Sequence, residues 1–97
     1  MKATGWQNGK GGTYGIRVGV ENARKFFDRD RASIAVEIGG RSTSFTLTQK
    51  FWTTCPEFRG AAIGAWLRDN GLAPWPSGQP PIVELTPLGP TRFKLSR

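Results

Sequence analysis

The sequence predicts a mainly β fold with two short helices (α+β), closed or half-closed into a barrel. Apolar residues alternate with polar or small residues in several short stretches, which is the period of strands that bury one face. Only two segments show helical spacing, and glycines and prolines separate the stretches. Together these stretches predict about six or seven short strands, a number typical of a closed or half-closed barrel.

The length of the chain predicts one domain. Its 97 residues fit a single domain over residues 1–97 with a small core. A hydrophobic content of 37% and an aromatic content of 11% are typical of a folded protein, which a disordered segment would not match.

The first part of the chain predicts a strand, a loop, a second strand and a helix. The glycine-rich run 8–12 favours a flexible basic loop. Ile16, Val18 and Val20 alternate with small or charged residues, which predicts a strand with these side chains on its buried face. A short helix is expected over Glu21 to Phe27, with Asn22 available as its N-cap.

The middle of the chain predicts a hairpin and then a long connection. Ile34, Val36 and Ile38 alternate, and Gly39-Gly40 is a strong signal for a two-residue turn into a partner strand that ends at residue 47. The following residues, 48–59, show neither the strand nor the helix period, so an irregular connection is expected there.

The last part of the chain predicts a helix, a stiff segment and a hairpin. Ile63, Trp66 and Leu67 share one core-facing stripe of a helix that Gly71 terminates. Four prolines in residues 73–81 favour a stiff linker within the domain. The final segment, PIVELTPLGPTRFKLSR, predicts two antiparallel strands.

The charge of the chain favours a polyanionic partner. Fourteen Lys and Arg against seven Asp and Glu give a formal net charge of +7. This imbalance by itself suits nucleic acid, an anionic membrane or heparin. No apolar run is long enough to span a bilayer or to form a signal peptide, so an intracellular, soluble protein is expected.

The residue counts exclude several kinds of enzyme. The chain has no histidine, so a Ser-His-Asp triad or a histidine-metal nuclease is excluded, and its single cysteine, Cys55, cannot form an intrachain disulfide. The acidic residues lack the spacing of a two-carboxylate nuclease within one strand pair. We therefore expect a protein without its own catalytic site, metal, cofactor or small-molecule substrate.

Three segments of the chain resemble a known family. They are YGIRVGVENARKFFD, FTLTQKFWTTCPEFRGAAIGAWLRDNGL and PPIVELTPLGPTRFKL. In this order, and over about residues 6–95, they resemble the B3-like pseudobarrel DNA-binding family. The likeness is closer to the recognition domains of bacterial type II restriction enzymes than to plant transcription-factor domains, since RVGVENARK replaces the apolar-proline-basic run of the plant pattern.

The resemblance implies a seven-stranded open pseudobarrel that binds double-stranded DNA sequence-specifically. Two segments of such a domain, an N-arm and a C-arm, enter the major groove. By position, the N-arm spans about residues 7–17 and the C-arm about residues 48–59. The resemblance implies either the target-recognition domain of a restriction enzyme, with a nuclease domain in a larger protein or complex as a possible partner, or a standalone relative of such a domain.

Both arms contain residue types that hydrogen-bond DNA. Arg and Lys pair with guanine, Asn and Gln with adenine, and Glu accepts from cytosine, while hydroxyl groups contact phosphates. The candidate DNA-binding residues are Gln7, Asn8, Lys10, Tyr14 and Arg17 in the N-arm, and Thr48, Gln49, Lys50, Trp52, Thr53, Thr54, Glu57 and Arg59 in the C-arm.

Some of these residues have a purely structural alternative. The glycines around Lys10 either let the backbone approach a phosphate or mark a loose terminus. Phe51 and Trp52 point to opposite sides of an extended stretch, so either Trp52 is outward or both pack as anchors. Cys55 is expected to be a small packing residue.

Two other functions fit the composition. A single-stranded DNA or RNA-binding barrel would also be basic, but it usually displays aromatic residues at alternate positions of one strand. Trp6, Phe51, Trp52 and Trp75 are instead scattered among predicted loops. A protein-interaction module is the other alternative, and APWPSGQPP is its only positive sign.

Overall fold

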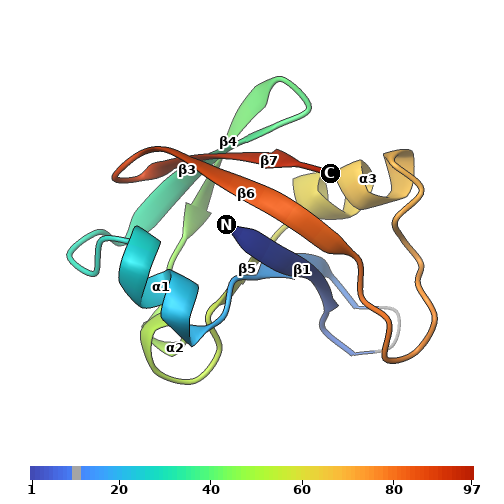
Figure 1. The fold of residues 1–97 in the computed structure, drawn as a ribbon, viewed down its shortest axis with the longest axis horizontal. Coiled ribbons are helices and arrows are strands. Elements are labelled where there is room, and N and C mark those ends of the chain that lie inside the picture. Colours follow the sequence, from blue (N-terminus) through green and yellow to red (C-terminus); the bar gives the residue numbers. More distant parts are fainter. Residues whose placement is uncertain (10–11) are drawn as a thin grey trace.

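Within residues 1–9 and 12–97, which the computed structural model describes, seven strands form one mixed, nearly closed pseudobarrel (Figure 1). The strands are β1 (Lys2–Gln7), β2 (Tyr14–Arg17), β3 (Ser33–Ile38), β4 (Arg41–Thr46), β5 (Glu57–Arg59), β6 (Ile82–Gly89) and β7 (Arg92–Ser96). They lie in the order β4-β3-β7-β6-β1-β2-β5. Only the β3–β7 pair is parallel among these described strands. The mainly β prediction is confirmed.

The same described ranges form three short helices, one more than the sequence predicts. They are α1 (Val20–Phe26), α2 (Gln49–Thr53) and α3 (Ala61–Asp69). Figure 1 shows α1 and α2 together at one end of the barrel and α3 at the other. In this part of the chain, no helix has the length and apolar character needed to cross a membrane.

The alternating pattern places one apolar face of each long strand inside the barrel. Ile34, Val36 and Ile38 are buried on β3, while the residues between them are less so. Each such side chain contributes roughly 1.5–3 kcal/mol when fully buried. The buried apolar residues are Ala3, Ile16, Val18, Ala23, Phe27, Ile34, Val36, Ile38, Phe45, Leu47, Phe51, Phe58, Ile63, Leu67, Val83, Leu85, Phe93 and Leu95.

The predicted hairpin between β3 and β4 is confirmed. Gly39 and Gly40 have φ values of 58° and 83°. Two consecutive positive φ values are the signature of a type I′ turn, which matches the twist of the flanking strands. The turn sets the register in which Ile38 pairs with Arg41 and Ile34 with Phe45.

The start of α1 corrects two predictions. Val20 was expected on the buried face of a strand, but it begins the helix and is 53% exposed. Asn22 was expected as the N-cap, yet Gly19 holds that position. The Asn22 side chain instead donates hydrogen bonds of 3.0 Å to the carbonyl oxygens of Lys2 and Val18. It therefore ties α1 to β1 rather than closing the helix.

The prediction of an irregular connection over residues 48–59 is wrong. This segment contains α2 and then β5, which pairs with β2. A helix of five residues is shorter than the window in which a helical period becomes visible. Phe51 is buried and packs its ring 5.1 Å from that of Phe27, so tertiary packing holds this short helix in place.

The barrel is nearly closed because its two edge strands approach each other. β4 and β5 stand at opposite ends of the strand order, so their backbones are not paired in a ladder. Phe45 and Phe58 pack across this gap with ring centroids 5.0 Å apart. Side chains therefore close the seam between β4 and β5.

Candidate nucleic-acid interface

A groove of about 480 Å³ lies over the seam between β4 and β5. The residues that line this seam groove are Trp6, Asn8, Ser44, Phe45, Thr46, Thr48, Lys50, Cys55, Glu57, Phe58 and Arg59. The structure thus brings residues of both predicted arms to one hollow.

Trp6 forms the centre of the groove's strand wall. It pairs with Gly15 on β2, which in turn pairs with Arg59 on β5. Directly paired residues point to the same face of a sheet, so Trp6 and Arg59 flank a position that has no side chain. A Cβ atom at Gly15 would lie 3.0 Å from the Trp6 ring. The indole therefore rests on the bare backbone of Gly15.

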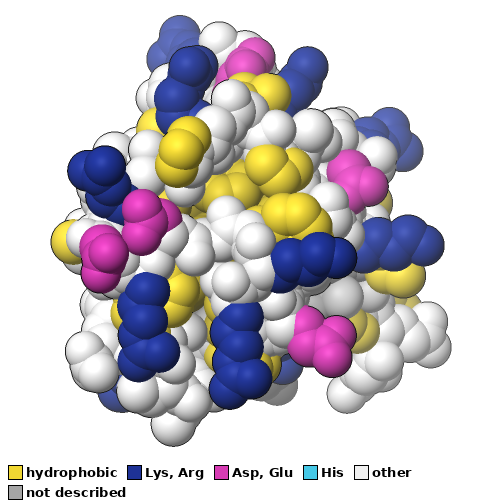
Figure 2. All heavy atoms as spheres, turned by 60° about the vertical axis from the view of Figure 1, so that its left-hand side comes forward, with side chains coloured by type: hydrophobic (Ala, Val, Ile, Leu, Met, Phe, Trp, Pro, Cys, Tyr) yellow, Lys and Arg dark blue, Asp and Glu magenta, His cyan; other side chains and the backbone are white. Residues whose placement is uncertain are grey.

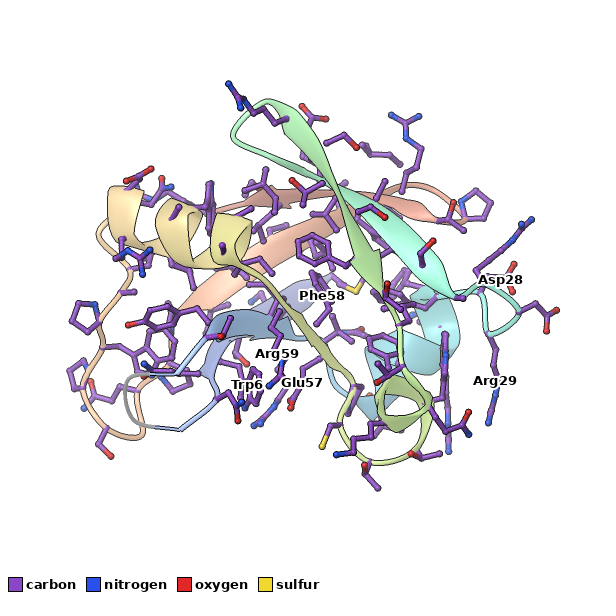
Figure 3. All side chains as sticks on the ribbon, turned by 180° about the vertical axis from the view of Figure 1, so that it is seen from behind. Trp6, Asp28, Arg29, Glu57, Phe58 and Arg59 are labelled. Carbon is purple, nitrogen blue, oxygen red and sulfur yellow. The ribbon has the colours of Figure 1, made fainter. Side chains whose placement is uncertain are left out.

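Two guanidinium groups lie against the Trp6 ring. The Cζ atoms of Arg17 and Arg59 are 6.0 Å and 5.9 Å from the ring centroid. At partly exposed sites such a contact is worth about 0.5–1 kcal/mol. Figure 3 shows Trp6, Glu57 and Arg59 close together on one side of the strands, with Phe58 on the other side. The contacts place Arg59 in the groove and Arg17 beside it.

Glu57 fixes the direction of Arg17. The Nε atom of Arg17 donates a 2.9 Å hydrogen bond to Oε2 of Glu57, and the two groups form an ion pair. The Glu57 side chain is only 10% exposed, whereas that of Arg17 is 53% exposed. The carboxylate is thus occupied by Arg17 and orients it, while the guanidinium remains accessible to a partner.

Arg59 is the more available of the two arginines. It is exposed, and within the described residues it forms no ion pair. Lys50 lines the same groove from α2 and is also exposed. The groove therefore contains two cationic groups without an internal counter-charge in the described part of the chain, and a third, Arg17, at its edge.

The N-arm residues occupy different places. Gln7 is half-buried, and its Nε2 donates to the carbonyl oxygen of Gly12 at 3.4 Å, which braces the β1–β2 connection. Asn8 is exposed in the groove, and its backbone N–H donates to Thr13 at 3.0 Å. Lys10 lies outside the described residues.

Tyr14 lies away from the seam groove. It pairs with Gln7, one position along from the Trp6–Gly15 pair, so its side chain points to the opposite face of the sheet. Its ring centroid is 5.3 Å from that of Trp75, and the Cζ atom of Arg68 on α3 lies 5.8 Å from its centroid. These contacts give Tyr14 a packing role.

The C-arm residues divide around α2. Thr48 and Lys50 line the groove, whereas Gln49, Trp52 and Thr53 border hollows on the other sides of the helix, and Thr54 is exposed at its end. The Thr53 hydroxyl donates to the Gln49 carbonyl at 3.1 Å. Of the C-arm candidates, Thr48, Lys50, Glu57 and Arg59 therefore meet in the groove.

The sequence left two arrangements open for Phe51 and Trp52: Trp52 pointing outward, or both rings packed as anchors. The structure lies between them. Phe51 is buried, as expected if the two rings diverge. Trp52 is half-buried, and its ring meets that of Phe51 edge-on with centroids 4.8 Å apart. Trp52 is thus partly anchored and partly available. Cys55, expected to pack, is exposed and lines the groove.

Trp6 and Ser44 also line the groove but were not among the candidate residues, whereas Thr46, which lines it too, was expected as a possible phosphate contact. Trp6 lies in β1, not in a loop, and Ser44 and Thr46 occupy outward positions of β4. Ser44 and Thr46 alternate with inward-pointing apolar residues, and this alternation was the sequence signal that could have placed them on the outer face of β4. The pairing register of β1, β2 and β5, which places Trp6 in the groove, depends on the whole sheet and cannot be read from the sequence of any one strand.

The comparisons with known proteins give no relative. No protein-family model, no curated protein and no solved structure matches this chain. In the part of the chain that the structure describes, no cluster of three or more Cys, Asp or Glu side chains could hold a metal ion.

Substitution of Gly15 by alanine is expected to destabilise the fold and disturb the groove. The added Cβ would lie 2.5 Å from the carbonyl oxygen of Phe58 and 2.9 Å from Cβ of Arg59. Overpacking of this kind costs about 1–3 kcal/mol. Gly89→Ala is the matched control, because a Cβ at Gly89 meets no atom within 4 Å. Urea denaturation of both variants measures the difference, and equal stabilities would contradict the packing described for Gly15.

Proposed function

We propose that this chain is a B3-like pseudobarrel domain that recognises a specific sequence in double-stranded DNA. The observation that carries the proposal is the pair of arginines, one from each arm, that lie against Trp6. In this proposal the N-arm and the C-arm enter the major groove and the seam groove follows the DNA backbone between them.

The chemistry of the arginines favours base recognition. A guanidinium presents a planar fork of donors that matches the O6 and N7 acceptors of guanine. Because Glu57 and Trp6 hold Arg17 in place, less conformational freedom is lost when it binds. Arg59 has no carboxylate partner among the described residues and can turn toward a base or a phosphate.

The remaining groove residues suit phosphate contacts. Lys50 supplies charge, while Ser44, Thr46 and Thr48 supply hydroxyl groups along β4 and the start of α2. Contacts of this type position a protein on the duplex without reading its sequence. The net charge of +7 adds a salt-dependent attraction to any nucleic acid. In this proposal the two arginines recognise bases, whereas Lys50 and the hydroxyl groups bind phosphates and hold the domain on the duplex.

Binding of single-stranded DNA or RNA is the second candidate, and the partial exposure of Trp6 and Trp52 favours it. A base would stack on an open aromatic face. One face of Trp6 rests on Gly15, and two guanidinium groups lie against the ring. These contacts occupy the surface that stacking needs, so the duplex is the better-supported partner.

The proposed role is recognition without catalysis. A nuclease domain, fused or associated, would cut the DNA, as in a restriction enzyme whose target-recognition domain is separate. Cofactors and small-molecule substrates have no part in this role.

Cys55 provides a direct test of the groove. It is exposed and lines the seam groove, so bound duplex should slow its reaction with a bulky maleimide by about tenfold or more. The labelled protein should bind duplex more weakly by a similar factor, because the label occupies the groove. Labelling rates with and without duplex, followed by gel-shift titration, measure both effects.

The control places the same label elsewhere. In a Cys55→Ser, Ser77→Cys double variant the thiol lies on the exposed proline-rich segment, away from the groove. Its labelling should affect duplex binding little. If bound duplex leaves Cys55 as reactive as in the free protein, and the label leaves binding intact, the groove is not the DNA-binding surface.

A further inference from the structure

A second hollow, of about 190 Å³, lies between α1 and α2. Ala23 and Phe27 from the α1 side and Phe51 from α2 line it, and all are buried. The half-buried ring of Trp52 borders it and is held edge-on by Phe51. We call this hollow the helix cavity. The two Phe rings are packed into the core, so Trp52 is the lining ring that a flat group can reach.

Two arginines give the helix cavity a positive rim. Arg24 on α1 and Arg29 in the turn after it both line the cavity, and none of its described lining residues is acidic. Asp28, which is adjacent to Arg29 in sequence, is engaged elsewhere, with a carboxylate oxygen 3.7 Å from Nε of Arg31. Neither Arg24 nor Arg29 forms an ion pair within the described residues.

The figures agree with this arrangement. Figure 2 shows the side of the molecule that carries α1 and α2, where hydrophobic side chains are exposed in the middle and Lys and Arg side chains, with some Asp and Glu between them, stand around them. In Figure 3 the Arg29 side chain extends from its turn along the side where α2 lies. An apolar aromatic floor beneath two unpaired cations complements a ligand that is flat at one end and anionic at the other.

We propose that the helix cavity binds one nucleotide unit, with its base against the half-buried ring of Trp52 and its phosphate on Arg24 and Arg29. Guanidinium groups bind phosphate through paired hydrogen bonds, and aromatic rings stack on any base. Two sources supply this chemistry: a free mononucleotide, or a base turned out of a bound duplex. The second source rests on the proposed function.

The position of α2 makes both sources accessible. The helix presents Lys50 to the seam groove and Trp52 to the helix cavity, so it separates the two sites. A nucleotide of DNA that lies in the groove is therefore within one helix of the cavity. A free nucleotide reaches the cavity directly from solvent at the exposed side of Val20.

Titration with the four deoxynucleoside 5′-monophosphates, followed by nuclear magnetic resonance, tests the cavity. Signals of α1, α2 and the turn at Arg29 should shift. An Arg24→Gln, Arg29→Gln double variant should bind the mononucleotides at least about tenfold more weakly. Val20→Phe, which adds a ring at the exposed mouth, should have a similar effect. The control is Lys25→Gln with Arg41→Gln, which removes the same charge at exposed positions that do not line the cavity.

A duplex with a single 2-aminopurine distinguishes the two sources, because this base becomes more fluorescent when it leaves the stack. A rise that Val20→Phe abolishes, while duplex binding persists, identifies an extruded base. Mononucleotide binding without that rise identifies a free nucleotide. If neither occurs, or if the cavity variants behave like the control, the proposal is overturned.

The outcomes also separate this inference from the proposed function. Arg59→Ala should weaken duplex binding and leave mononucleotide binding unchanged, because Arg59 lines the groove and not the cavity. Mononucleotide binding by a protein that binds no duplex would support the cavity and reject the proposed function. Sequence-specific duplex binding, with neither mononucleotide binding nor a rise in 2-aminopurine fluorescence, would support the proposed function and reject the nucleotide site in the helix cavity.

Discussion

Removal of both arginines that lie against Trp6, in an Arg17→Ala, Arg59→Ala double variant, is expected to weaken binding of the preferred duplex by about 30-fold or more. A guanidinium paired with guanine contributes about 1–3 kcal/mol of discrimination, and each 1.4 kcal/mol is a factor of ten. The two groups lie on the same Trp6 ring, so their losses need not add. Fluorescence anisotropy on the selected site measures the change.

The single variants and a distant pair complete this test. Arg59→Ala, and Arg17→Ala to a smaller extent, should relax the preference at one base pair. Lys2→Ala and Lys94→Ala remove exposed cations from β1 and β7 that do not line the groove, so sequence preference should remain intact. If these lysines control base preference and the arginines do not, the two-armed model is wrong.

Truncation of Phe27 to alanine is expected to produce the largest loss of stability, about 3–5 kcal/mol. Its ring is stacked 4.5 Å from that of Phe93 and lies 5.1 Å from that of Phe51. It therefore joins the end of α1 to both α2 and the sheet. A domain of this size has a total stability of about 5–15 kcal/mol, so the loss is a large fraction of the whole.

The neighbouring residue is the control. Phe26 is only half-buried, and Lys25 covers its ring at 5.5 Å. Phe26→Ala should therefore cost about 1 kcal/mol. Urea denaturation followed by circular dichroism measures both variants. Equal losses would show that Phe27 does not anchor the two helices to the barrel.

The strands could be predicted because each carries its own signal. The alternation of Ile34, Val36 and Ile38 fixes which face is buried whatever the strand's partners, and Gly39-Gly40 fixes the turn that follows. Burial of one face is a local consequence of local composition. The mainly β class follows from several such stretches.

The helix α2 could not be predicted, because packing rather than periodicity forms it. Five residues offer too few positions to show a helical stripe, and Phe51 is held by Phe27 from another part of the chain. Phe51 was expected to point inward from an extended stretch. It does so from a helix, so the burial prediction is confirmed although its structural basis is different.

The groove was predicted only in part. Residue chemistry identified Lys50 and Arg59, which line the groove, and Arg17, which lies beside it against Trp6. It could not find Trp6, because the pairing of β1 with β2 and of β2 with β5 decides that Trp6 stands beside Arg59. It also could not predict that Glu57 forms an ion pair with Arg17. Cross-strand register is a property of the whole sheet.

Equilibrium competition on a duplex selected from a randomised library tests directly whether the domain recognises a specific sequence in double-stranded DNA. The selected duplex should compete best, random duplex should compete roughly 1,000-fold less well, and the separated strands should compete no better than random duplex. Equal competition by every duplex, or preference for the separated strands, would contradict sequence-specific recognition of double-stranded DNA.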